Sequence, residues 1–78
     1  MSKLPVISPG DLEKLLLYLG FYRKRQRGSH VFYQHPDGRA TVFPFHSGED
    51  IGRGLLRKIL RDIGIEPEEY IHLRKEVL

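Results

Sequence analysis

The chain has 78 residues and a formal net charge of +3 at pH 7, a length that supports one small domain with a modest hydrophobic core. It contains no cysteine, which excludes disulfides and thiolate metal sites, and no apolar run approaches the ~20 residues that cross a bilayer. We therefore expect a single soluble domain over residues 1–78, located in the cytoplasm, with no membrane partner.

A first helix is predicted over residues 9–19. Ser8 followed by Pro9 is typical of a helix start, because a serine hydroxyl caps free amides and proline suits the first helical position. Four leucines then repeat at helical spacing and form one apolar face: Leu12, Leu15, Leu16 and Leu19. Gly20 is the expected stop.

Three strands are predicted next, over residues 21–26, 30–34 and 39–45. The connections between them are short, with Gly28-Ser29 in the first and Pro36-Asp37-Gly38 in the second. Short connections join antiparallel neighbours, so the strands should form a three-stranded antiparallel meander.

Side chains of the predicted sheet divide between two faces. Along the third strand, Thr41 and Phe43 alternate with Ala40 and Val42, as in a half-buried strand. We expect this strand to end at Pro44 or to lie at an edge, since proline cannot donate to the ladder. Core packing is expected for the aromatic Phe32 and for at least one tyrosine.

Two helices are predicted after the sheet. Leucines and isoleucines from Leu55 to Ile63 follow helical spacing and Gly64 closes the segment. Pro67 opens a last, short helix. The order α-β-β-β-α predicts an α+β two-layer sandwich in which helices cover one face of the sheet and leave the other free.

Positive charge is concentrated in the middle of the chain. Five basic and one acidic side chain fall within residues 21–39, so this segment carries the whole charge excess. A basic patch is typical of a protein that binds a polyanion, although charged edge strands also protect a sheet from aggregation. The residues that we expect to contact phosphate are Lys24, Arg25, Arg27, Gly28, Ser29 and Arg39.

His30 follows the basic segment directly and is the candidate catalytic residue. Imidazole suits general acid–base chemistry because it titrates near neutral pH, but the local sequence also fits an ordinary strand residue beside a turn. We expect His35 to face solvent in its turn and His72 to lie at the surface, while His46 could assist a phosphate site at the start of the second helix. The histidine spacings match no metal motif, so neither a metal site nor a cofactor is expected.

Four segments carry a family resemblance when they are taken in order along the chain. They are Arg27-Gly28-Ser29-His30, His35-Pro36-Asp37-Gly38-Arg39, Pro44-Phe45-His46 and the helix from Leu55 to Ile65. From Ser8 to about Tyr70 the chain resembles the HicA toxins, also called YcfA-like proteins. The resemblance implies a fold like that of a double-stranded-RNA-binding domain, and an mRNA interferase that acts without a ribosome. It further implies a neighbouring HicB antitoxin that blocks the active face, and it places the family's catalytic histidine at His30 and its glycine at Gly28.

One departure from the family pattern lies before the second long helix. The family commonly has Pro-Gly-Thr there, whereas this chain has Arg53-Gly54-Leu55. The threonine hydroxyl and any phosphate contact made by it are lost, and we expect Gly54 to serve as a weaker cap.

The resulting hypothesis is the toxin of a type II toxin–antitoxin system, a metal-independent endoribonuclease that is monomeric when free. The ribose 2′-hydroxyl would be the nucleophile, His30 the general base or acid, and the basic residues the phosphate ligands. Two alternatives use the same residues without catalysis. One is an RNA-binding module of similar fold, and the other is a protein-interaction domain that recruits a partner to its exposed sheet.

Overall fold

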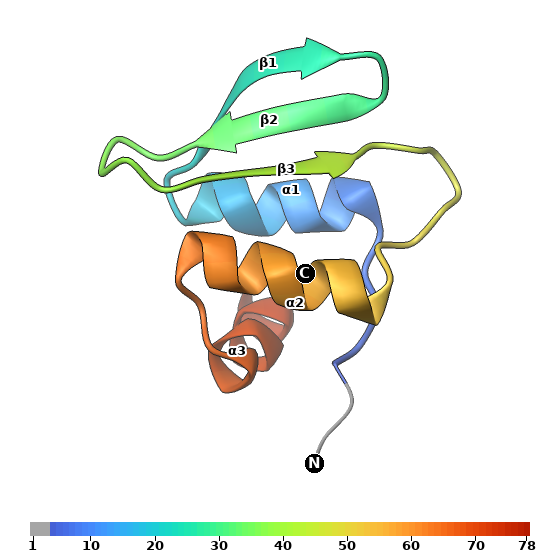
Figure 1. Ribbon diagram of the computed structural model, residues 1–78. Helices are drawn as coiled ribbons and strands as arrows, with labels where there is room; N and C mark the ends of the chain where they lie inside the picture. Colours follow the sequence, from blue (N-terminus) through green and yellow to red (C-terminus); the bar gives the residue numbers. More distant parts are fainter. Residues whose placement is uncertain (1–3) are drawn as a thin grey trace.

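A computed structural model describes residues 4–78 and shows a three-stranded sheet lying on a layer of helices (Figure 1). The elements in chain order are α1 (Pro9–Tyr18), β1 (Tyr22–Arg27), β2 (His30–Gln34), β3 (Ala40–Pro44), α2 (Arg53–Ile63) and α3 (Pro67–Val77). This order and the antiparallel sheet β1-β2-β3 confirm the predicted α+β architecture. The first three residues of the domain predicted over residues 1–78 lie outside the described part. Within residues 4–78, no helix is long and apolar enough to cross a membrane.

Both ends of α1 follow the local signals of its sequence. The Ser8 hydroxyl accepts a hydrogen bond from the Asp11 amide at 3.1 Å, which satisfies one of the free amides of the first turn. At the other end Gly20 has φ +95°, and the Phe21 amide donates to the Leu16 carbonyl at 2.9 Å. This left-handed glycine cap turns the chain directly into β1.

The hairpin between β1 and β2 is closed by Gly28 and Ser29. Gly28 has φ +56°, while every described non-glycine residue, Ser29 included, has negative φ. A positive φ confined to the first central residue is the pattern of a type II′ turn, which matches the twist of antiparallel strands. The Ser29 carbonyl also accepts a hydrogen bond from the Phe45 amide at 2.7 Å, so the hairpin is held to the end of β3. As predicted, β3 ends at Pro44 and lies at an edge of the sheet.

The hydrophobic core lies between the sheet and the helices. The sheet contributes Val31, Tyr33 and Phe43, and the rings of Tyr33 and Phe43 stack with centroids 5.0 Å apart. The fully buried side chains from α1 and α2 are Leu12, Leu15, Leu16, Leu56, Ile59, Leu60 and Ile63. Each such side chain stabilises the fold by about 1.5–3 kcal/mol relative to an exposed one.

The last helix, α3, is as long as α2, not the short segment predicted from the sequence. It packs against α1 and α2 on their side away from the sheet (Figure 1). The buried Tyr70 ring holds it there, and its hydroxyl donates to the Pro5 carbonyl at 2.6 Å. The longer helix therefore results from contacts with distant segments.

Two further expectations, one for β2 and one for the start of α2, are wrong. Phe32 does not enter the core, because strand alternation places Val31 and Tyr33 on the helix side and Phe32 on the opposite face, where it is half-buried. Gly54 does not cap α2, because the helix already starts at Arg53 and Gly52 occupies the cap position without a side-chain hydrogen bond.

Candidate functional site

His30 is exposed, and because it alternates with the buried Val31 and Tyr33 it lies on the face of the sheet turned away from the core. It is paired with Arg27 on β1 and with Pro44 on β3. Side chains of directly paired residues share a face, with Cβ atoms about 4.5–5.5 Å apart. The side chains of His30 and Arg27 therefore start from neighbouring positions on the same exposed face, away from the core. Arg27, His30 and Pro44 form one row of paired residues across the sheet, which we call the His30 row.

The next row on this face is centred on Phe32. Its cross-strand partners are Arg25 on β1 and Val42 on β3. The Arg25 guanidinium lies over the Phe32 ring, 4.6 Å from its centroid, within the range of a cation–π contact. Two adjacent rows thus place two arginines, the histidine and an aromatic ring on one accessible surface.

A hollow of about 460 Å³ opens over this surface, and we call it the sheet groove. Its lining residues come from all three strands and from α2: Lys24, Arg25, Phe32, Tyr33, Gln34, Ala40, Thr41, Val42, Lys58 and Asp62. On the α2 side, Asp62 accepts hydrogen bonds from Lys58 at 2.8 Å and from Thr41 at 2.9 Å. Sequence reasoning missed this wall, since only the tertiary fold brings α2 beside β3.

The β1–β2 turn has an accessible backbone. Apart from Gly28 and its two chain neighbours, no described residue has an atom within 4 Å of the position that a Gly28 Cβ would occupy. The Gly28 carbonyl accepts a hydrogen bond from the Gln26 side-chain amide at 2.9 Å. The structure therefore brings five of the six predicted phosphate-contacting residues onto one hairpin beside His30: Lys24, Arg25, Arg27, Gly28 and Ser29.

Arg39 is the exception, because it lies at the other end of the sheet. Its backbone amide and Nε donate to the Asp37 carboxylate at 3.0 and 2.9 Å, and its guanidinium donates to the Ile63 carbonyl. The same guanidinium stacks 5.1 Å from the Phe21 centroid. Hydrogen bonds from the Arg39 amide and side chain, with the nearby positive charge, hold the pKa of Asp37 below its ordinary value. Arg39 thus caps the end of α2 and is separated from His30.

His35 is half-buried, and the expectation that it faces solvent is wrong. Its Nε2 lies 3.2 Å from the Leu19 carbonyl, and its Nδ1 accepts a hydrogen bond from the Asp37 amide at 3.1 Å. The ring also meets Phe21 edge-on, with centroids 5.0 Å apart. The turn after β2 folds back onto the end of α1, so His35 joins the two.

The two remaining histidines are exposed and lie outside the sheet groove. His46 lies in the loop before α2, and His72 lies on α3, where its Nε2 is 3.6 Å from a Glu76 carboxylate oxygen. The surface position predicted for His72 is confirmed. Among residues 4–78, no group of three histidine, aspartate or glutamate side chains is arranged to hold a metal ion.

A charged cluster that the sequence did not reveal lies on the helix side of the sheet. The Glu13 carboxylate accepts hydrogen bonds from the Tyr33 hydroxyl at 2.6 Å and from Arg23. Burial raises the pKa of Glu13, but the bonds from Arg23 and Tyr33 outweigh it and hold that pKa below its ordinary value. Burial and the Glu13 carboxylate raise the pKa of Tyr33. Arg23 therefore ties β1 to α1 and does not belong to the open face.

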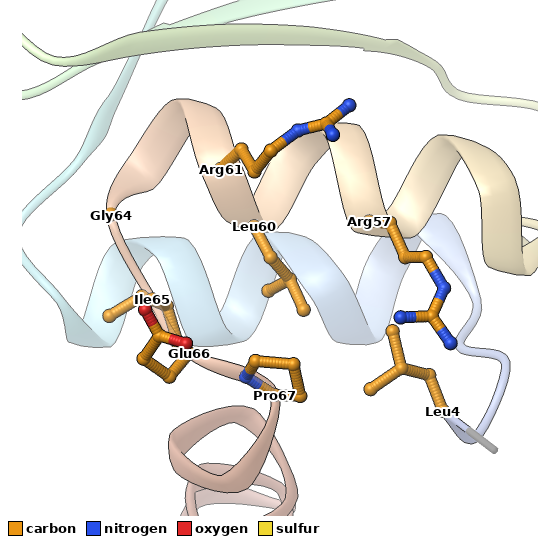
Figure 2. A pocket seen from close by; sticks show the side chains of 8 residues that line it. All are labelled: Leu4, Arg57, Leu60, Arg61, Gly64, Ile65, Glu66 and Pro67. Carbon is orange, nitrogen blue, oxygen red and sulfur yellow. The ribbon is translucent and has the colours of Figure 1, made fainter. Parts of the chain in front are cut away.

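A second hollow, of about 360 Å³, lies among the helices. Figure 2 shows Leu60 pointing from α2 toward Pro67, and Arg57 reaching toward Leu4. It contains none of the residues predicted for a functional site. The sheet groove and the adjoining His30 row are thus the candidate functional site.

The sequence was compared with models of protein families. The sequence model described as "HicA toxin of bacterial toxin-antitoxin" matches residues 10–65. This range runs from the first turn of α1 to the end of α2 and contains the whole candidate site. No curated protein matches the chain.

Proposed function

The chain belongs to the HicA toxin family of bacterial toxin–antitoxin systems, and on this premise we propose that it is an mRNA interferase that uses His30 to cleave RNA. HicA toxins are generally ribonucleases that have an RNA target and an antitoxin partner. The single observation that carries the proposal is the position of His30, exposed on the open face and paired with Arg27.

The proposed reaction uses the nucleophile that RNA itself carries. The ribose 2′-oxygen forms a bond to the neighbouring phosphorus while the bond from phosphorus to the 5′-oxygen breaks. His30 removes the 2′-proton or protonates the departing 5′-oxygen, and water completes the other transfer. The products are a 2′,3′-cyclic phosphate and a free 5′-hydroxyl, and no oxidant or co-reactant is consumed.

The hairpin beside His30 supplies the electrostatic part of this proposal. Arg27 and Arg25 face the same side as His30, and Lys24 lines the adjoining groove. Cations fixed around the phosphate stabilise the charge that accumulates in the transition state. The turn of the exposed Gly28 and the half-buried Ser29 offers further contacts to phosphate oxygens.

The decisive experiment compares His30→Ala with a matched histidine variant. His72→Ala is the control, because His72 is also exposed but lies on α3, away from the sheet. Purified proteins are incubated with a single-stranded RNA in EDTA, and cyclic-phosphate products are quantified by mass spectrometry. General acid–base help from one side chain corresponds to roughly 10²–10⁴ in rate, so His30→Ala should lose that factor and His72→Ala almost nothing. Cleavage by His30→Ala within a few-fold of wild type would remove this residue from the mechanism.

A non-catalytic RNA-binding module is the second outcome of the same experiment. It would bind the RNA with equal strength in wild type and His30→Ala, and neither would cut it. An RNA methylated at every 2′-oxygen separates binding from cleavage, since it should be bound and remain intact.

The proposed partner is a HicB-like antitoxin that binds over the open face. We further propose that the toxin acts in the cytoplasm and is a monomer when no antitoxin is bound. Expression of the toxin alone should arrest growth, and expression of His30→Ala should not. A short adjacent reading frame whose product restores growth and binds the chain would identify the antitoxin.

A further inference from the structure

We infer that the sheet groove binds one unpaired base of the RNA, with Phe32 as its stacking surface, next to the phosphodiester held at His30. This inference rests on the proposed function and assigns it a base-binding subsite. It gives a role to the one large aromatic side chain that β2 presents away from the core.

Phe32 has the properties of a stacking surface. Its ring contributes nothing to the buried layer beneath the sheet, yet it is flanked by Val42 and covered on one side by the Arg25 guanidinium. Unstacked RNA bases lie on aromatic rings and on arginine planes in proteins that bind single strands. The Arg25–Phe32 pair presents both surfaces in one hollow.

The charges around the groove determine which side of it the RNA backbone faces. On the β1 wall, no ion pair among residues 4–78 joins Lys24 or Arg25 to an acidic side chain. On the α2 wall, Lys58 is neutralised by Asp62. A phosphate backbone is therefore attracted to the β1 side, and the attached base extends across Phe32 toward α2.

The spacing along β2 relates this base to the cleavage site. Phe32 is two residues from His30 on the same face, which corresponds to about 7 Å along a strand. A base on Phe32 thus belongs to a nucleotide next to the phosphate at His30. Gln34 follows on the same face and lines the groove, and its amide can both donate to and accept from a base edge. The groove would thereby select the nucleotide beside the cut.

Photo-crosslinking tests the placement without depending on catalysis. The probe is a single-stranded RNA, methylated at every 2′-oxygen, with one 4-thiouridine moved along its length. After irradiation and trypsin digestion, the peptide of residues 28–39 should carry the crosslink, and fragmentation should place it on Phe32. Tyr18 is the internal control, because it is an aromatic residue 61 % exposed on α1. Crosslinks that mark Tyr18 as strongly as Phe32, or that miss Phe32 at every thiouridine position, would overturn the inference.

Substitutions at Phe32 provide the second measurement. Phe32→Leu removes the ring and keeps its bulk, whereas Phe32→Tyr keeps the ring. Loss of one stacking contact should weaken binding of the methylated RNA roughly 5- to 100-fold in Phe32→Leu, with near wild-type binding in Phe32→Tyr. The dependence of log K on log [salt] should stay unchanged, because no phosphate contact is lost. Equal affinities for Phe32→Leu and wild type contradict a stacking role.

These measurements fail independently of the proposed catalysis. If His30→Ala cleaves normally while Phe32 crosslinks, the base subsite stands and the catalytic proposal falls. If His30→Ala is inactive and Phe32 neither crosslinks nor affects binding, the nuclease stands and the groove has another occupant, such as the antitoxin.

Discussion

Removal of the Tyr33 hydroxyl tests how α1 is held to the sheet. The hydroxyl donates to the Glu13 carboxylate at 2.6 Å, and the residue is only 1 % exposed. A hydrogen bond to a charged acceptor contributes about 1.5–3 kcal/mol. Glu13 keeps its bond from Arg23, and its side chain is 19 % exposed, so we expect the lower part of that range, about 1.5–2 kcal/mol, for Tyr33→Phe. In a domain of this size the melting temperature should fall by roughly 6–16 °C.

The assay is a double-mutant cycle in thermal and urea unfolding. It compares wild type, Tyr33→Phe, Glu13→Gln and the double variant, and the coupling energy between the two positions should exceed about 1 kcal/mol. Effects that add within ~0.5 kcal/mol, or a melting temperature lowered by less than ~2 °C in Tyr33→Phe, would refute the reasoning. Cleavage of RNA by folded Tyr33→Phe should be unchanged, because His30 lies on the opposite face.

Three further predictions concern the turn, the acid stability and the salt dependence. Gly28→Ala should destabilise the protein by about 1–2 kcal/mol because φ is +56° there, whereas Gly54→Ala, in the helical first turn of α2, should stabilise it by about 0.5–1 kcal/mol; urea unfolding measures both, and equal shifts would contradict the turn geometry. The pKa of Glu13 is lower in the folded protein than in the unfolded chain. Its ionised carboxylate therefore stabilises the fold above the ordinary carboxyl pKa, and this stabilisation is lost as the pH falls through the folded pKa. The free energy of unfolding of Glu13→Gln should therefore fall less steeply on acidification than that of wild type. Parallel pH profiles of the two proteins would contradict this role of Glu13. Lys24→Gln should reduce the slope of log K against log [salt] for single-stranded RNA by about 0.7, and an unchanged slope would show that Lys24 contacts no phosphate.

Local signals predicted most of the fold. The leucine spacing of α1, its serine cap and the glycines at both helix ends are short-range features, so the sequence displays them directly. The turn residues fixed the meander in the same way, because positive φ at Gly28 and Gly38 is a local requirement. The hairpin grouping of the basic residues around His30 follows from these local elements alone.

Long-range contacts account for what the sequence could not predict. Period-two alternation divides β2 into two faces but does not say which face is buried. Both faces carry a bulky side chain, so the sequence alone does not show that Phe32 stays outside the core. Arg39 and His35 look like turn residues, and only the return of the chain onto α2 and α1 reveals their partners. The α2 wall of the sheet groove likewise depends on residues about twenty positions away from β3.

The separation of His30 and Phe32 from the buried layer has an evolutionary consequence. Substitutions at these two positions leave the Val31–Tyr33 side of the strand intact, so under the roles proposed above for His30 and Phe32 a lineage could silence the toxin without unfolding it. An inactive copy would still bind any antitoxin that recognises the unchanged part of its surface. Cells that survive toxin expression should therefore carry two kinds of substitution in the toxin. Substitutions in the core should lower the amount of toxin in the cell, whereas substitutions on the open face should leave that amount unchanged.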